Sequence, residues 1–288
     1  MNEFDLQMHS TASDGIFSPR DLVEQAKKRE VTAIALTDHD TIDGIDEAFN
    51  AGKELGVEVI PAIELSCRHN QIGLHILGYG IDHKNRRLVN TTKKIKVWRI
   101  AKAKEMVRRL QEQGFEITYK NVAKRAKGGV IARPHIAFEI LENPSNRIRL
   151  GEIKNKGDFI TNFLVPRKSA YVKGNDLTCK ETIEIIHGAN GVAVWSHPAV
   201  HFPSSFKGLE QTLNELIALG LDGIEILNAS MTKLESVFLH GLALKYHLLC
   251  TAGSDFERPH EAGLKREGGG AVGDFSTFGL KTDDMLMN

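Results

Sequence analysis

The chain of 288 residues contains little cysteine, few aromatic side chains and no long hydrophobic run. Its 3 cysteines are widely spaced and form no CxxC pair, which argues against a disulfide framework and against a cysteine-rich zinc site. No stretch approaches the roughly 20 consecutive apolar residues of a membrane span, and no apolar signal region stands near the N-terminus. We therefore expect a cytoplasmic protein that does not associate with membranes.

The chain also lacks net charge, because 37 basic and 37 acidic residues cancel, so the whole chain is not a binder of polyanions. The glycine-rich stretch GGGAVGD (268–274) lacks the Lys-Ser/Thr of a phosphate-binding loop, and we expect a flexible loop there. Hydrophobic residues make up 41% and charged residues 26%, which is typical of a globular enzyme. This length predicts one large α/β domain, or one domain with an insertion.

Short apolar runs alternate with helical segments, which predicts a parallel sheet or barrel. The expected strands are VTAIALT (31–37), VEVIPAIEL (57–65), GLHILGYG (73–80), GVAVWSHP (191–198), DGIEILN (222–228) and LLCTAGSD (248–255). Helices are expected to begin at Ser18-Pro19 and to cover 43–55, the segment around 209–217, and 232–246. The chain is therefore predicted to be of the α/β class.

The middle of the chain differs from the rest in charge. Residues 84–127 contain 15 Lys/Arg, 3 Glu and no Asp, a charge of +15 − 3 = +12, so the remainder carries −12. Apolar side chains from Ile100 to Leu110 form one helix face in this segment. We predict a basic helical insertion domain over 84–168, within a barrel domain formed by 1–83 and 169–288.

Two explanations of this basic charge remain open. The charge could attract a polyanion such as RNA or DNA, or it could be a solvated helical face that balances an acidic barrel. Trp98, Phe115 and Tyr119 are the only aromatic residues of the segment, so it has no clear platform for stacking many bases. This favours short nucleotides or 5′ ends as substrates over long nucleic acid.

Acidic and imidazole side chains stand in or directly after the expected strands. They are His9, Asp38, His39, Asp40, Glu64, His75, His197 and Asp255. In a parallel barrel the carboxyl ends of the strands converge on one face, and several buried carboxylates and imidazoles on one face are best neutralised by divalent cations. A single such histidine is more often a hydrogen-bonded core residue, but the joint pattern predicts a multinuclear metal site.

The other histidines are interpreted as structural. They are expected in helices or turns without carboxylate neighbours, and they are His69, His83, His187, His240 and His247.

Six segments resemble, in order, the motifs of the PHP family (polymerase and histidinol phosphatase domains). They are DLQMHSTASDG (5–15), TDHDT (37–41), PAIELS (61–66), HILGYG (75–80), SHP (196–198) and GSDF (253–256). The resemblance implies a distorted (β/α)7 barrel with up to three metal ions at the strand ends. It points to the stand-alone branch with a helical insertion, which includes nucleotide phosphatases and a 5′-to-3′ exonuclease that trims RNA.

The resemblance also implies which side chains hold metal. Carried over by position, the three ligand groups are His9, Glu64 and Asp255 for a first ion, Glu64, His75 and His197 for a second, and Asp14 and His39 for a third. Glu64 would bridge the first two ions.

Two positions depart from the family pattern. Gln7 stands where the first motif has a histidine, and Glu257 stands where a histidine follows the last aspartate. A glutamine carbonyl or a glutamate can still ligate, so both remain candidate ligands, and His260 is a further candidate for the second gap. The predicted cofactors are two or three divalent ions among Mn, Zn, Fe and Mg, with a weaker preference for zinc.

Further roles follow from the resemblance. Asp38 or His39 could protonate the leaving oxygen, with Asp38 favoured as the group that orients a ligating histidine. In ARPH (132–135), Arg133 and His135 match an Arg-x-His segment that grips phosphate; the alternative is a helix N-terminus with a surface arginine. Val200 replaces an arginine that often follows the His-Pro dipeptide.

We therefore expect a metal-dependent phosphoesterase that uses metal-activated water and releases inorganic phosphate. Its substrates would be nucleoside mono- or 3′,5′-bisphosphates or the 5′ ends of short oligonucleotides, and no obligate protein partner is evident. One alternative is a small-metabolite phosphatase of the histidinol phosphate type. Another is a degenerate PHP domain that binds nucleotide or a partner with little turnover.

Overall fold

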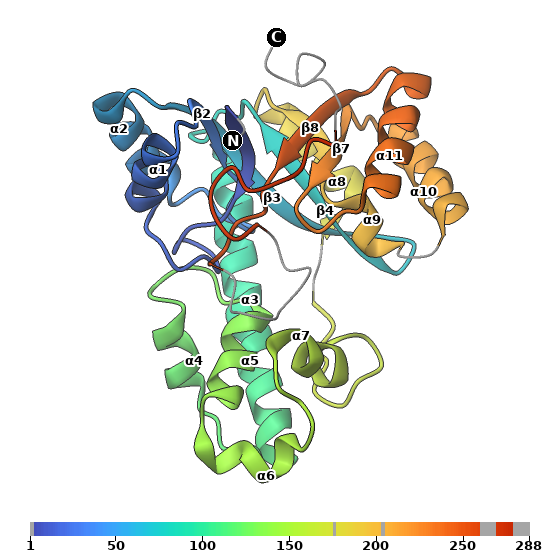
Figure 1. Cartoon of the computed structure of the whole chain (residues 1–288). Helices are drawn as coiled ribbons and strands as arrows, with labels where there is room; N and C mark the ends of the chain where they lie inside the picture. The colour runs from blue at the N-terminus through green and yellow to red at the C-terminus, as the bar shows by residue number, and fades with distance from the viewer. Residues whose placement is uncertain (1–2, 175–176, 203–204, 260–268, 279–288) are drawn as a thin grey trace.

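A computed structural model describes residues 3–174, 177–202, 205–259 and 269–278 of the chain. Figure 1 shows a sheet surrounded by helices in the upper part and a purely helical part below it. No helix within the described ranges is long and apolar enough to cross a membrane.

Strands wrap around the upper part in sequence order. The path of the described sheet is β1 (Phe4–Met8), β2 (Ala33–Leu36), β3 (Glu58–His69), β4 (Ile72–Tyr79), β6 (Val192–Trp195), β7 (Gly223–Asn228) and β8 (Leu249–Gly253), and β5 (Leu177–Thr178) pairs with β3 beside it. The ends of the path approach each other, since the Asp255 N–H donates to the Gln7 carbonyl at 2.9 Å. The sheet is a nearly closed barrel, which confirms the predicted fold class.

One strand runs against the others. β1, β2 and β3 are parallel, and so are β6, β7 and β8, but β4 is antiparallel to both β3 and β6. Asn70 and Gln71, with φ of 45° and 72°, form the tight turn that reverses the chain. The expectation of an all-parallel barrel is therefore wrong at β4, and His75 reaches the site from the middle of a reversed strand.

Helices cover the outside of the barrel. They are α1 (Pro19–Lys28), α2 (Ile45–Leu55), α8 (Cys179–Gly188), α9 (Pro198–His201), α10 (Phe206–Ala218) and α11 (Lys233–Tyr246). Ser18 caps α1 by accepting from the Asp21 N–H, and Pro19 fills its first turn. Leu22 and Val23 of this helix are fully buried, and each such side chain contributes about 1.5–3 kcal/mol to stability.

The lower part consists of helices packed around a second hydrophobic core. They are α3 (Arg86–Glu112), α4 (Tyr119–Arg125), α5 (Arg133–Leu141), α6 (Arg147–Leu150) and α7 (Lys156–Phe159), with a 3-10 turn at Pro144–Asn146 and a π-helical turn at Ile160–Leu164. The buried members of this core all lie between residues 103 and 170. The predicted insertion limits of 84 and 168 enclose nearly all of them and stay a prediction.

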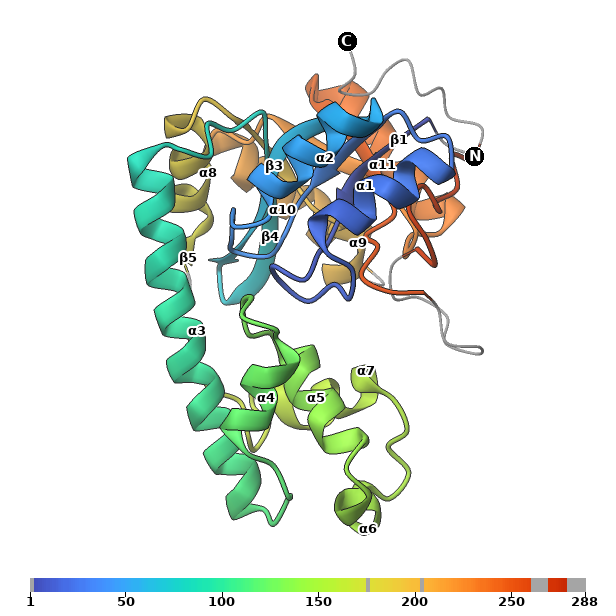
Figure 2. The same cartoon turned by 90° about the vertical axis from the view of Figure 1, so that its left-hand side faces the viewer.

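Helix α3 belongs to both parts (Figure 2). Leu88 and Ile95 of its first half are buried in the barrel core. Val107 and Leu110 of its second half are buried in the core of the insertion. Where the chain enters the insertion, the two parts are therefore joined by a continuous helix.

Candidate metal centre

The predicted ligands converge at one end of the barrel. His9 follows β1, His39 follows β2, Glu64 lies within β3, His75 lies within β4, His197 follows β6 and Asp255 follows β8. A cavity of about 630 Å³ opens onto this end, and the insertion forms its opposite wall. The backbone turns sharply where the ligands leave the strands, with φ of 31° at His197 and 55° at Asp255. Such conformations cost about 1–3 kcal/mol each, so surrounding contacts must hold them.

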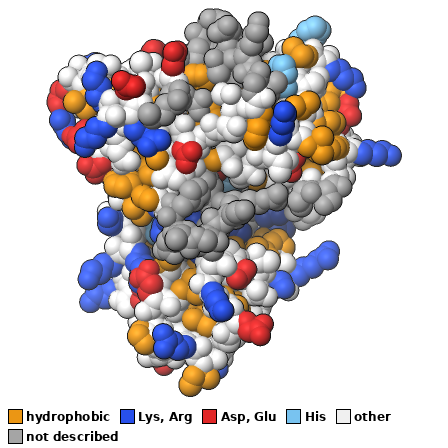
Figure 3. Space-filling view, viewed as in Figure 1, with side chains coloured by type: hydrophobic (Ala, Val, Ile, Leu, Met, Phe, Trp, Pro, Cys, Tyr) orange, Lys and Arg blue, Asp and Glu red, His pale blue; other side chains and the backbone are white. Residues whose placement is uncertain are grey.

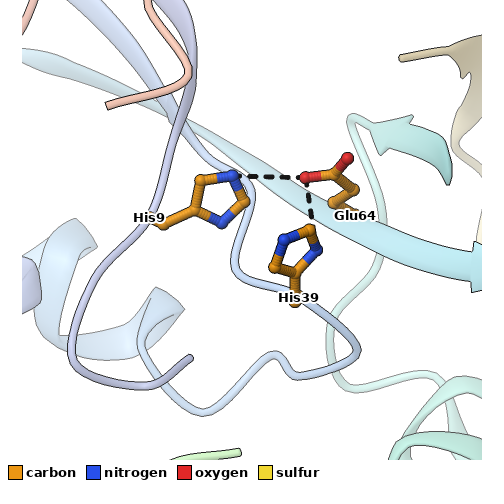
Figure 4. A group of neighbouring side chains, drawn as sticks. All are labelled: His9, His39 and Glu64. Carbon is orange, nitrogen blue, oxygen red and sulfur yellow. Dashed lines mark ion pairs between the residues drawn. The ribbon is translucent and has the colours of Figure 1, made fainter. Parts of the chain in front are cut away.

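Glu64 is fully buried, and its two carboxylate oxygens face two different pairs of imidazoles. Oε2 lies 3.2 Å from His9 Nε2 and 3.4 Å from His39 Nδ1 (Figure 4). Oε1 lies 2.9 Å from His75 Nδ1 and 3.1 Å from His197 Nε2. Within the described ranges, these two sets each bring three ligand atoms close enough to share an ion, and Glu64 belongs to both.

Several buried polar atoms of this cluster have no hydrogen-bond partner in the protein. They are His9 Nδ1, Asp14 Oδ1, His39 Nδ1 and His197 Nδ1. Unpaired polar atoms are costly to bury. His75 Nδ1 and His197 Nε2 also lie 3.2 Å apart while both face Glu64 Oε1. Nitrogen and oxygen donors grouped in this way suit a divalent transition metal, so the residues fit ions that share Glu64.

Two further carboxylates flank the first imidazole pair. Asp255 Oδ1 lies 3.1 Å from His9 Nε2, as expected for a common ion. Asp14 is more distant, with Oδ1 3.9 Å from His9 Nδ1 and Oδ2 3.9 Å from His39 Nε2. His39 therefore lies between Glu64 and Asp14, whereas the resemblance groups it with Asp14 alone. The division of these side chains among three ions stays a prediction.

Burial and neighbouring charges set the protonation of the cluster. Burial lowers the pKa of His9 and of His197, but hydrogen bonds to nearby carboxylates, chiefly Glu64 for His197, outweigh it. The pKa of His9 lies well above its usual range and that of His197 is raised to about 9. At His39 burial prevails and lowers the pKa to about 4. Burial opposes ionisation of Glu64, yet the surrounding imidazoles bring its pKa well below its usual range. A cation that binds here must displace protons.

The two positions that depart from the family pattern both contact protein groups. The Gln7 amide nitrogen lies 2.9 Å from Ser196 Oγ. Glu257 accepts a hydrogen bond of 2.8 Å from Lys156 of the insertion, and burial raises the pKa of its carboxyl. That either residue ligates an ion stays a prediction, and His260, the further candidate at the position of Glu257, lies outside the described residues.

Asp38 organises the first motif. It is buried, and it accepts hydrogen bonds from the Ser10 N–H at 2.7 Å, from Ser10 Oγ at 2.7 Å and from Ser13 Oγ at 2.6 Å. Burial raises the pKa of this carboxyl. We expected Asp38 to orient a histidine ring, but its contacts are with the serines of the loop that carries His9 and Asp14. Asp38 therefore restrains the loop between His9 and Asp14.

The ARPH segment begins α5 at the edge of the cavity. Ala132 is the N-cap, and its N–H donates to His135 Nδ1 at 3.0 Å. His135 is buried and does not line the cavity, whereas Arg133 does. Because Nδ1 accepts, the neutral His135 ring carries its proton on Nε2. Just before the segment, a Cβ at Gly129 would lie 2.4 Å from the Thr11 carbonyl oxygen, so only glycine permits this approach of the insertion to the first motif.

Three histidines interpreted as free of carboxylate neighbours do have them. His69 Nε2 lies 2.6 Å from Glu215, His83 Nε2 lies 2.9 Å from Asp46 and His187 Nε2 lies 2.7 Å from Asp222. The carboxylates come from distant parts of the chain, so sequence neighbourhood could not show them. None of these histidines is in the ligand groups described above.

Sequence reasoning missed the polar groups that stand behind and beside the ligands. They are Arg99, Lys156, Ser196, His201, Glu225 and Asn228. Asn228 ends a buried strand. A polar residue at the end of an apolar strand can indicate a functional site, but it is missed when only carboxylates and imidazoles are considered. The rings of His201 and His197 lie 5.2 Å apart, and His201 lines the cavity. Arg99 pairs with Asp40 across the two parts of the molecule, which no local pattern predicts.

Comparisons with known proteins agree with this geometry. The PHP domain model matches residues 5–189. A 5′-3′ exoribonuclease of Haemophilus influenzae is 34% identical over 257 residues, which cover 89% of this chain and 90% of that protein. A 3′,5′-nucleoside bisphosphate phosphatase of Chromobacterium violaceum is 28% identical and the match covers 91% and 90%. A solved structure from Bifidobacterium adolescentis, described as a metal-dependent phosphoesterase, has a TM-score of 0.78 at 29% identity and covers 93% and 91%. The chain belongs to the PHP domain family.

Proposed function

We propose that the protein is a metal-dependent phosphoesterase acting on nucleoside mono- or 3′,5′-bisphosphates or on the 5′ ends of short oligonucleotides. The observation that supports this most is the buried Glu64 carboxylate, which has a pair of imidazoles within 3.4 Å of each oxygen. A shared carboxylate of this kind suits a two-ion centre for phosphate ester hydrolysis. Manganese, zinc, iron and magnesium are all candidates, because the group offers both imidazole and carboxylate ligands.

The bound ions would supply hydroxide near neutral pH and neutralise charge on the phosphate. The chain's own residues fix and orient the reactants. His9 is held directly after β1 and Glu64 within β3, and Arg133 lines the cavity with a guanidinium that suits phosphate oxygens. Asp38 already accepts three hydrogen bonds, so we assign it to loop positioning. His39 is the other predicted proton donor, but burial lowers the pKa of its ring to about 4, so near neutral pH the ring is neutral and suits a ligand better than an acid.

The cavity supports a nucleotide as the substrate. Its volume of about 630 Å³ lies in the range of sites for single small molecules. Trp98 and Tyr171 line it together with the ligand cluster, so an aromatic surface for a base exists even though the insertion has few aromatic residues. The names of the exoribonuclease and the bisphosphate phosphatase, both similar in sequence, fit the same substrate class.

The basic segment is partly neutralised by the barrel. Lys84 pairs with Asp46, Lys96 with Asp43 at 3.2 Å, and Arg99 with Asp40. On the face shown in Figure 3, Lys and Arg side chains occur over both parts of the molecule and are interspersed with acidic ones. These pairs favour the explanation in which the segment balances an acidic barrel, and they support short substrates over long nucleic acid.

A substrate panel tests the proposal. Protein loaded with Mn²⁺ would be assayed for phosphate release from 3′,5′-bisphosphates, AMP, a 5′-phosphorylated RNA trimer and histidinol phosphate. We expect the nucleotides to be hydrolysed at least about 10-fold more efficiently than histidinol phosphate, and His197→Ala to abolish turnover. Preference for histidinol phosphate would support the small-metabolite alternative. An inert wild type that Gln7→His activates would support the degenerate one.

A further inference from the structure

Gln7 is fully buried at the end of β1, where the family has a histidine ligand. Its amide nitrogen lies 2.9 Å from Ser196 Oγ and 3.5 Å from Glu64 Oε2. Its amide oxygen lies 3.2 Å from Asn228 Nδ2. An amide nitrogen donates hydrogen bonds and offers no lone pair to a cation. The end of the amide that faces Glu64 therefore decides whether Gln7 can ligate an ion.

The orientation of both amides is fixed by Ser230. The Ser230 backbone N–H donates to Asn228 Oδ1 at 2.9 Å, and Ser230 Oγ donates to the same oxygen at 2.7 Å. A backbone N–H cannot accept, so Asn228 must turn its oxygen to Ser230 and its amino group to Gln7. A reversed Gln7 amide would set two amino groups against each other. The Gln7 oxygen is therefore held on the side of Asn228 and its amino group on the side of Glu64.

The same network reaches the second imidazole pair. Asn228 Nδ2 also donates to Glu225 Oε2 at 3.3 Å, and that oxygen accepts the His197 backbone N–H at 2.7 Å. Glu225 is fully buried. This contact holds the His197 backbone at its φ of 31°. Asn228 thus connects Gln7, whose amino group contacts Glu64, with Glu225, which accepts the His197 backbone N–H.

We propose that Gln7 is a positioning residue for Glu64 and not a metal ligand. Its amino group restrains the carboxylate that both imidazole pairs share, through directional hydrogen bonds that begin at Ser230. The protein ligands around Glu64 Oε2 are then His9, His39 and Asp255. With one protein ligand fewer, one more position on an ion is open to water or substrate. This inference rests on the metal-dependent function proposed above.

Metal affinity of paired variants tests the proposal. Gln7→Met removes both polar ends at similar size, and Asn228→Leu removes the amide that orients Gln7 and that also donates to Glu225. A positioning role predicts that each lowers Mn²⁺ affinity by roughly 10-fold in competition with a chelating dye. It also predicts that the double variant is weaker than either single one by no more than about 2-fold, because the residues act as one unit. Ser236→Ala, a buried hydroxyl on α11 outside the network, is the matched control and should leave affinity unchanged.

A ligand role predicts a different pattern, in which Gln7→Met loses affinity while Asn228→Leu keeps it, and this result would overturn the proposal. Unchanged affinity in both variants would overturn it as well.

The Mn²⁺-loaded crystal structure, with the ions located by anomalous scattering, gives a second readout. We expect Gln7 Oε1 to contact Asn228 and no ion to lie within about 2.5 Å of it; an ion at that distance would contradict the proposal. Neither readout needs activity. An inactive protein that binds Mn²⁺ in the expected way would contradict only the proposed function, whereas a protein that binds no Mn²⁺ would overturn both proposals.

Discussion

The barrel and the insertion bring opposite chemistry to one cavity. The barrel contributes buried carboxylates and imidazoles, with Glu64 and His9 fully enclosed. The insertion contributes cationic side chains at the cavity wall, among them Arg133 and Lys156. Strand ends are rigid and can hold ligand atoms about 3 Å apart, as an ion requires. Long cationic side chains on helices are better suited to following a substrate phosphate.

The charges of the two parts also hold them together. Arg99 of α3 bonds to Asp40 of the barrel, and Lys156 bonds to Glu257. Arg99 and Lys156 also line the cavity, so the same cations of the insertion pair with barrel acids and form part of the cavity wall. Substitutions in one part that leave the other intact test what each part contributes.

The largest effect is expected from the barrel, at Glu64. Glu64→Gln keeps the shape but removes the charge that both imidazole pairs face, so turnover should fall by at least about 10²–10³-fold, together with most metal binding. Metal content by mass spectrometry and phosphate release check this together. Glu58→Gln, on the half-exposed start of the same strand, is the control. A variant that retains two ions and activity would show that Glu64 is not shared.

The next largest effect is expected at the contact between the barrel and the insertion. Arg99→Met leaves the buried Asp40 carboxylate without its guanidinium, which should lower the free energy of unfolding by about 1–3 kcal/mol. Arg108→Met is the matched control on the same helix, because its partners Glu105 and Glu112 are more exposed, and it should leave the free energy of unfolding nearly unchanged. Urea denaturation of the metal-free proteins measures both. Equal changes in the free energy of unfolding would mean that the Arg99–Asp40 pair contributes no more to stability than an exposed pair.

A pH dependence is expected from the barrel alone. The pKa of His197 is raised to about 9, above its value of 6.5 in the unfolded chain. The stability that this proton contributes to the metal-free protein is therefore present below pH 6.5 and is lost as pH rises through about 9. Since a cation must displace the proton, Mn²⁺ affinity should rise by roughly tenfold per pH unit over this window and then level off. His197→Gln should remove this part of the slope, and an unchanged slope would contradict the assignment.

The smallest effect is expected at the aromatic wall of the cavity, where we propose that a base binds. Trp98→Leu keeps an apolar residue but removes the aromatic face, so KM for a nucleotide should rise several-fold with kcat little changed. For p-nitrophenyl phosphate, which has no base, KM should stay the same. Phe163→Leu, in the core of the insertion and away from the cavity, controls for loss of packing. Equal increases for both substrates would place the base elsewhere.

The convergence of the candidate ligands was predictable because its signal is local. Glu64, His197 and Asp255 follow or end apolar runs, and parallel strands bring such ends together. The reversed direction of β4 was not predictable, because a strand has the same pattern in either direction, and only the Asn70-Gln71 turn reverses it. The orientation of the Gln7 amide depends on Asn228, 221 residues away. Pairs between distant residues, such as Arg99 with Asp40, leave no trace in a single sequence.

Helix α3 has a consequence for how this molecule can change. Leu88 and Ile95 are anchored in one core, and Val107 and Leu110 in the other. Local unfolding in either core loosens the helix that supports the other, so we expect the two parts to melt in one cooperative transition. The insertion therefore cannot be exchanged as an independent unit. New substrate preferences in this architecture would arise by replacing single side chains on the cavity wall, because exchanging the whole insertion would remove a support of the barrel itself.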